Sequence, residues 1–325
     1  MDKLPQLGKQ IDQIVQPTFK IYDSLLRKNA DTIRSVKKET FQYGSHDRQQ
    51  LDVYSPPTPN TINGRRPVLM FEYGGGLVQG HKTLPMIADG LAHANVGAFF
   101  ALQHGYTVVI ADYRLISHGA KFPSGGEDIA LAVEWILKNQ VGAGAEPIDL
   151  FIMGNSAGGM HISTFLLHPD FAETRRKISS GDGPRLRGVV MLSVPFHFRS
   201  ANPNRAEILQ TYYGDYDVNS VYGLLKSARQ RQTPLDFVQH GTRVLVLNGE
   251  LDPEDEILVP RHDFLTEWLE MKDVQSTTAL AVDMMAGHNH ISPPLGLSTG
   301  IAEEEAWGHQ VAAFCDNVRK FRPES

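Results

Sequence analysis

The sequence predicts a single α/β domain in which helices cover both faces of a mostly parallel sheet. Two observations support this class. Short apolar runs alternate along the chain with helical patterns of ten or more residues, as expected for strands joined by crossover helices. In addition, two apolar runs end directly in glycine-rich turns, at residues 74–76 and 154–159.

Residues 1–38 are expected to be helical. Apolar residues fall on one helical face before Pro17 and on another face after it, so the pattern predicts two helices that meet at this proline. Such helices need a surface to cover. They either pack on the core or form a lid over an active site, and the sequence leaves both interpretations open.

Strands are expected where short apolar or β-branched runs are bounded by turn residues. These runs are 40–43, 50–54, 67–73, 106–111, 149–153, 186–193, 244–247 and 278–282. Apolar residues with helical spacing predict helices near 84–103, 125–139, 257–271 and 303–320, and another from the second glycine turn to about residue 167.

The segment 196–240 interrupts this alternation. It is polar but carries several aromatic residues, which is typical of an insertion above a sheet rather than of a sheet layer. We therefore expect one domain over 1–325, with an N-terminal lid segment at 1–38 and an insertion lid segment at 196–240.

The composition excludes several classes of protein. Of the 325 residues, 41% are hydrophobic, and the formal charge of −6 comes from mixed acids and bases, so no basic stripe indicates nucleic acid or an anionic membrane as a partner. The single cysteine, Cys315, lies in an apolar run and is expected to be buried. We find no secretory signal and no membrane span, so a cytoplasmic location is expected.

The run Gly154-Asn155-Ser156-Ala157-Gly158 contains the candidate nucleophile. It follows an apolar strand and precedes a helix, which is the context that a Gly-x-Ser-x-Gly elbow requires. Small residues on either side avoid clashes in this sharp turn, and the hydroxyl is then exposed at the carboxyl edge of the sheet. We predict that Ser156 is a catalytic nucleophile, with an ordinary tight turn as the alternative.

A second glycine run, Gly74-Gly75-Gly76, follows the strand predicted at 67–73. Acyl transfer passes through a tetrahedral intermediate whose oxygen carries negative charge, and N–H groups must converge on that oxygen without side chains in the way. Consecutive glycines permit this approach. The N–H groups of Gly75, Gly76 and Ala157 are therefore predicted to form an oxyanion hole, with a flexible loop as the alternative.

An acidic loop follows the strand at 244–247. A carboxylate there would hold the tautomer of a catalytic histidine and stabilise its charged form. Asp252 is the preferred candidate because of its offset from Gly249 at the end of the strand. Glu250, Glu254 and Asp255 in the same loop are its rivals.

Two histidines, His288 and His290, follow the last predicted strand. One of them is expected to reach Ser156 as general base. They lie only two residues apart, so spacing alone does not choose between them.

These motifs, in this order, resemble the hormone-sensitive-lipase-like and arylformamidase-like branch of the α/β-hydrolases. The resemblance spans roughly residues 40–320. The segments that also carry it are Gln50–Pro56, Asp112–Leu115, Lys121–Pro123 and Glu127–Asp128, and Ala94–Phe100 is similar to fungal members, which suggests a fungal source.

The resemblance implies the α/β-hydrolase fold and the chain order serine, acid, histidine. In this branch the reactive histidine is often followed by a large apolar residue. The dipeptide His290-Ile291 fits this pattern better than His288-Asn289. His290 is therefore expected to be the base, with His288 as the alternative.

The sequence also departs from that branch. Tyr73 stands where a histidine usually leads the glycine run, and Leu77 stands near the position where arylformamidases usually carry tryptophan. Tyr73 is expected either to support the oxyanion loop or to shape the acyl pocket. Tyr73, Leu77 and Asn155 are the residues expected to contact the substrate.

Together these residues predict a serine hydrolase that cleaves carboxylic esters of small to medium apolar substrates through an acyl-serine intermediate. Neither a cofactor nor a metal is expected. The alternatives are an arylformamidase, amidase or lactonase with the same triad, an acyltransferase and, from another class, a non-catalytic ligand-binding receptor of the same fold. The expected partner is a small-molecule ester. The oligomeric state stays open, with a homodimer as one option.

Overall fold

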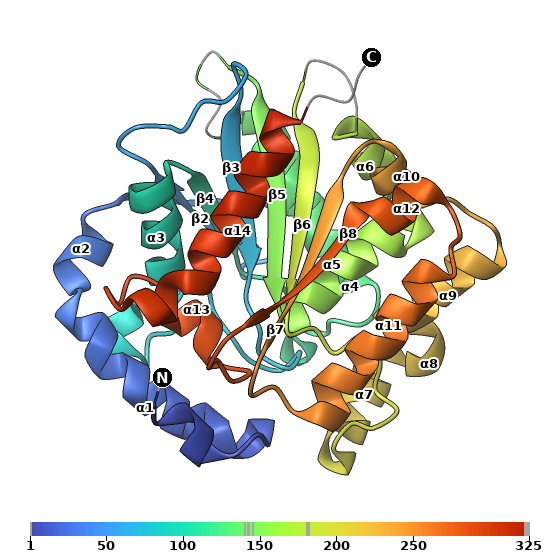
Figure 1. The fold of residues 1–325 in the computed structure, drawn as a ribbon, viewed down its shortest axis with the longest axis horizontal. Coiled ribbons are helices and arrows are strands. Elements are labelled where there is room, and N and C mark those ends of the chain that lie inside the picture. Colours follow the sequence, from blue (N-terminus) through green and yellow to red (C-terminus); the bar gives the residue numbers. More distant parts are fainter. Residues whose placement is uncertain (1, 140, 142–143, 145, 180–182, 322–325) are drawn as a thin grey trace.

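The computed structural model describes residues 2–139, 141, 144, 146–179 and 183–321. Within them a single mixed sheet runs through the centre of the molecule, and helices cover both of its faces (Figure 1). Its strands are β1 (Lys37–Gln42), β2 (Gln50–Ser55), β3 (Arg66–Glu72), β4 (Thr107–Ala111), β5 (Ile148–Asn155), β6 (Arg185–Leu192), β7 (Arg243–Gly249) and β8 (Leu280–Met285).

The strand order is β1-β2-β4-β3-β5-β6-β7-β8. β2 pairs antiparallel with β1 and with β4, and the later neighbours all pair in parallel. The carboxyl ends of the parallel strands therefore meet at one edge of the sheet. This edge is where loops of α/β folds usually gather functional side chains.

Two sets of helices sandwich the sheet (Figure 1). One face is covered by α1 (Ile11–Lys28), α2 (Ala30–Arg34), α3 (Ala94–His104), α13 (Ser292–Gly296) and α14 (Ala302–Lys320). The helices on the other side are α4 (Ser124–Asn139), α5 (Ala157–Leu167), α6 (Ala172–Lys177), α7 (Ala206–Tyr213), α8 (Tyr216–Asn219), α9 (Val221–Gln230), α10 (Asp236–Gln239), α11 (Val259–Leu269) and α12 (Val274–Ala279). In the described part of the chain, no helix is both long enough and apolar enough to cross a bilayer.

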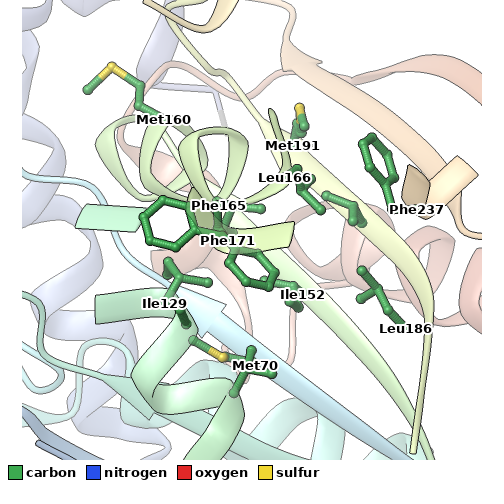
Figure 2. Packing of buried hydrophobic residues seen from close by; sticks show 14 of the residues in the cluster. Met70, Ile129, Ile152, Met160, Phe165, Leu166, Phe171, Leu186, Met191 and Phe237 are labelled. Atoms are coloured by element: carbon green, nitrogen blue, oxygen red, sulfur yellow. The ribbon is translucent and has the colours of Figure 1, made fainter. Parts of the chain in front are cut away.

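The core explains why the central strands read as continuous apolar runs. In β3, Met70 faces the cluster under α4 and α5, whereas Leu69 and Phe71 face the cluster under α3 and α14. Figure 2 shows the first cluster, in which Met70 and Ile152 of the sheet lie in one group with helix residues such as Ile129 and Phe165. Burial of each such side chain contributes about 1.5–3 kcal/mol.

Several predicted boundaries were wrong. The N-terminal segment does not break at Pro17, because α1 runs through this residue as one helix. A proline inside a helix removes one backbone hydrogen bond, but Ile14, Thr18, Tyr22 and Leu26 form a buried stripe that holds α1 on the core. Tertiary packing therefore overrides the local signal.

The helix expected near 84–103 begins only at Ala94. Ala88, Asp89 and His93 have positive φ angles, which a continuous helix does not allow. The last strand begins at Leu280, two residues later than expected, because α12 occupies the residues before it. The segment 196–240 forms α7 to α10, of which α9 packs beside α11 and α10 lies beside α12 and α6 (Figure 1).

Candidate active site

Strand β5 leads into Ser156 at a sharp turn. The serine directly precedes α5 and has a φ of 51° and a ψ of −118°, a conformation that costs a non-glycine residue about 1–3 kcal/mol. A Cβ at Gly158 would lie 2.2 Å from the carbonyl oxygen of Glu72, and a Cβ at Gly154 would lie 2.6 Å from the backbone nitrogen of Gly159. Glycine is therefore required at both positions of the elbow.

His290 lies in the loop between β8 and α13. Its Nε2 is 3.0 Å from the Oγ of Ser156, and its Nδ1 is 3.1 Å from the Oδ1 of Asp252. His290 is 3% exposed and Asp252 is 0% exposed, whereas Ser156 is half-buried. The structure thus brings three of the predicted residues, from three different strand ends, into one hydrogen-bonded line.

The carboxylate of Asp252 is held on both oxygens. While Oδ1 faces His290, Oδ2 accepts hydrogen bonds from the N–H of Gly249 at 2.8 Å and from the hydroxyl of Ser193 at 2.6 Å. The side-chain amide of Asn248 lies 3.4 Å from the same oxygen. These donors fix the orientation of a carboxylate that is fully removed from water.

The rival acids occupy other places. Glu250, Glu254 and Asp255 are exposed, and the carboxylate of Glu250 accepts the N–H of Gly287 at 2.7 Å.

Sequence reasoning missed Ser193, whose hydroxyl donates to Asp252. The only signal was its place at the end of the strand next to β7, and no motif marks it.

His288 points elsewhere. Its Nδ1 lies 2.9 Å from the hydroxyl of Ser292, and its side chain is 1% exposed. Burial lowers the pKa of His288 to about 4, so its imidazole is neutral at neutral pH. The two histidines therefore have different partners and do not converge on one site.

The glycine loop lies against the nucleophile. A Cβ at Gly74 would be 3.1 Å from the Cβ of Ser156. Gly75 has a φ of 150° and Gly76 a φ of 62°, and a Cβ at Gly75 would lie 1.9 Å from the carbonyl oxygen of Gln79. A side chain is therefore excluded at Gly75, and one at Gly76 would be strained by the positive φ angle.

Three N–H groups remain available beside the serine. Among the described residues, the N–H groups of Gly75 and Gly76 donate no hydrogen bond. Ala157 is the first residue of α5, and the N–H groups of a first helical turn have no acceptor within the helix. The positive end of the α5 dipole also lies here, which favours negative charge.

Tyr73 supports this loop from behind. Its hydroxyl donates to the carboxylate of Asp112 and accepts a hydrogen bond from Arg48 at 2.9 Å. Its ring stacks between His93 and Tyr113, with centroids 5.1 and 4.9 Å away. The side chain is 0% exposed, which favours the supporting role, and a contact of Tyr73 with a substrate stays a prediction.

The other two expected substrate contacts are also largely buried. Leu77 is 1% exposed, and Asn155 is 6% exposed. The Asn155 side chain donates to the carbonyl oxygen of Leu192 at 3.3 Å. A contact of Leu77 or Asn155 with a substrate stays a prediction.

The segment 196–240 contributes a cation that sequence reasoning missed. Arg205, directly before α7, places its Nη2 3.9 Å from the position that a Cβ at Gly76 would take. Its Nη1 donates to the carboxylate of Glu256 at 3.1 Å. One side of the glycine loop is therefore covered by a side chain from 196–240.

Comparison with known proteins places the chain in a family. A family model described as BD-FAE matches residues 51–253, which is more than half of the chain. The chain belongs to the BD-FAE family. The matched region includes the glycine loop, the elbow and Asp252, and ends before His290.

This member of the BD-FAE family is also similar to mouse carboxylesterase 3B. The two are 35% identical over 128 residues, which are 38% of this chain and 21% of the relative. The chain thus spans about a fifth of the length of that carboxylesterase.

Solved structures support the α/β-hydrolase fold for this BD-FAE chain. Esterase B from Lactobacillus rhamnosis superimposes with a TM-score of 0.62 at 16% identity, covering 94% of this chain and 96% of the esterase. An esterase from Pyrobaculum calidifontis gives a TM-score of 0.59 at 19% identity, covering 96% and 94%. At such identities the likeness concerns the fold.

Proposed function

We propose that this chain is a serine hydrolase that cleaves carboxylic esters of small to medium apolar substrates through an acyl-serine intermediate. The observation that carries the proposal is the hydrogen-bonded line from Ser156 through His290 to Asp252. The similarity to carboxylesterases supports esters over amides, formamides and lactones, which the same triad attacks.

The first half of the reaction forms the acyl-enzyme. Nε2 of His290 takes the proton of Ser156 while Oγ attacks the ester carbonyl carbon. Asp252 holds Nδ1–H and stabilises the imidazolium that forms. The carbonyl oxygen becomes an oxyanion and is bound by the N–H groups of Gly75 and Ala157, with Gly76 as the third donor.

The tetrahedral intermediate then collapses. The bond from carbon to the alcohol oxygen breaks, and His290 gives its proton to the leaving alcohol. Water enters, loses a proton to His290 and attacks the acyl carbon. The Ser156 oxygen leaves with that proton, which releases the acid and restores the enzyme.

Apolar packing beside the elbow supports an apolar acyl group. Met160, one turn after Ser156, lies in the cluster that also contains Leu77 and Phe198. The hydroxyl of Tyr213, from the insertion, points to the sulfur of Met160 at 3.5 Å. The apolar side chains packed around the elbow are therefore the observation that favours an apolar acyl group.

The motifs quoted from the sequence support the finer assignment to the hormone-sensitive-lipase-like and arylformamidase-like branch. A fungal source, a cytoplasmic location and a homodimer stay predictions.

The test compares three variants on p-nitrophenyl butyrate. Ser156→Ala is expected to lower kcat by about 10⁴-fold or more, and His290→Gln by a similar factor. His288→Gln is expected to keep kcat within about tenfold. A Ser156→Ala variant that keeps most of its activity would show that the nucleophile is wrongly assigned.

A fluorophosphonate probe separates an enzyme from a receptor of the same fold. The wild type is expected to be labelled at Ser156, and Ser156→Ala to remain unlabelled. A folded wild type that neither binds the probe covalently nor hydrolyses any ester of a graded series would be a binding protein.

A further inference from the structure

Asn289 fixes the backbone around His290. Its Oδ1 accepts the N–H groups of Ile291 and of Ser292, each at 3.0 Å. The side chain therefore folds over the residue that follows it and closes a tight turn. Asn289 is 0% exposed, so no water can replace a lost partner without a rearrangement of the loop.

The donor side of the same amide is held by the N-terminal helix. Nδ2 of Asn289 donates to the hydroxyl of Thr18 at 2.9 Å, although the two residues are 271 positions apart. Because Oδ1 is occupied by two N–H donors, the amide orientation is fixed, and Thr18 must act as the acceptor. Thr18 is itself 0% exposed.

Helix α1 is firmly placed for this role. One turn after Thr18, the hydroxyl of Tyr22 donates to the carboxylate of Glu304 at 2.5 Å. At the end of α1, the side chain of Asn29 donates to the carbonyl oxygen of Thr299 at 3.0 Å. The helix is thus tied to α14 and to the loop before it, on the same side of the sheet as α13.

From this chain of contacts we infer that Thr18 is a positioning residue for the general base. Its hydroxyl orients the amide of Asn289, the amide fixes the turn, and the turn sets the imidazole of His290 against Ser156. The N-terminal helix is then part of the catalytic arrangement and not only a cover over it. The inference rests on the proposed function.

Loss of the Thr18 hydroxyl, which accepts the hydrogen bond from Asn289, has a defined consequence. Valine has the shape of threonine but cannot accept a hydrogen bond, so Thr18→Val leaves a buried N–H of Asn289 without a partner. The amide is then expected to shift toward another acceptor and to move His290 with it. Small misplacements of a catalytic group cost one to two orders of magnitude in rate.

The test measures kcat and KM for p-nitrophenyl butyrate in three variants. Thr18→Val is expected to lower kcat about tenfold with KM changed less than twofold, because substrate binding is untouched. Thr18→Ser keeps the acceptor and is expected to stay within about twofold of the wild type. The matched control is Thr242→Val, at the amino end of β7, whose buried hydroxyl donates to the carbonyl oxygen of Leu186 at 2.9 Å.

The control separates positioning from general stability. Thr242→Val also loses a buried hydrogen bond and is expected to lower the melting temperature while keeping kcat. Equal losses of kcat in Thr18→Val and Thr242→Val, or no loss in Thr18→Val, would overturn the inference. If Thr18→Val folds poorly, Thr18→Ala removes the same acceptor with a smaller side chain, and the rate of fluorophosphonate labelling per folded molecule reports on the base.

Failure of the proposed function gives a different result. A wild type without turnover or labelling would refute the hydrolase itself and this inference with it. A fully active wild type with an equally active Thr18→Val would refute only the role of Thr18.

Discussion

Glu72 ends β3 directly before the glycine loop and is an unusual carboxyl group. It is 1% exposed, and neither of its oxygens has a hydrogen-bond partner among the described residues. Burial, helped by the nearby charges of Asp128 and Asp112, raises the pKa of Glu72 well above its ordinary value of 4.5. We therefore expect Glu72 to stay protonated in the folded protein at pH values where it ionises in the unfolded chain.

Replacing Glu72 by glutamine should stabilise the protein as the pH rises. Below pH 4.5 the carboxyl is protonated in both states, so the wild-type side chain pays no ionisation penalty. Above it, the unfolded state binds fewer protons than the folded state, and the free energy of unfolding of the wild type falls with pH. Each pH unit over which only the folded state keeps this proton lowers the free energy of unfolding by about 1.4 kcal/mol, so two such units lower it by about 2.8 kcal/mol. Glutamine does not titrate, so the variant loses none of this free energy of unfolding as the pH rises.

The assay is urea unfolding of the wild type and Glu72→Gln at pH 5, 6, 7 and 8. The difference in free energy of unfolding should widen in favour of the variant until the folded carboxyl titrates. Glu207→Gln, at an exposed position of α7, controls for the loss of a surface carboxyl and should stay within about 0.5 kcal/mol throughout. A difference between Glu72→Gln and the wild type that is constant from pH 5 to 8 would refute the reasoning.

Two further predictions concern the site itself. Ser193→Ala removes the 2.6 Å hydrogen bond to Asp252. Since hydrogen bonds to charged groups contribute about 1.5–3 kcal/mol, kcat should fall roughly tenfold or more with little change in KM. A variant with a changed melting temperature but an unchanged kcat would contradict this expectation. Gly158→Ala places a Cβ 2.2 Å from the carbonyl oxygen of Glu72 and should cost about 1–3 kcal/mol in thermal unfolding together with most of the activity. Wild-type stability and activity in that variant would show that the elbow tolerates a side chain.

Local signals were sufficient for the central sheet and the elbow. The strands from β3 to β7 are buried on both faces, so each contains a run of at least four consecutive apolar residues. Ser156 could be predicted because the strained turn demands glycine two positions away on each side. Asp252 was preferred for its offset from Gly249, whereas the choice of His290 over His288 followed from the resemblance because spacing alone did not separate the two histidines.

Contacts between distant parts of the chain could not be predicted. Ser193 and Asp252 lie 59 positions apart, and Thr18 and Asn289 lie 271 apart. The sequence around a serine at a strand end or a threonine in a helix does not indicate a hydrogen-bond partner so far along the chain. The same limit explains the error at Pro17, where a buried stripe, visible only after folding, keeps the helix continuous.

The contacts around the triad indicate which segment can vary with the substrate. The acid is enclosed, and the base is held through Thr18 of α1, so a change in either region is expected to disturb the chemistry for every substrate alike. The glycine loop is different, because Gly74, Gly75 and Gly76 are only partly buried and the insertion reaches them through Arg205. Selectivity between substrates is therefore expected to follow residues of 196–240, which reach the glycine loop, and not residues of the N-terminal helix.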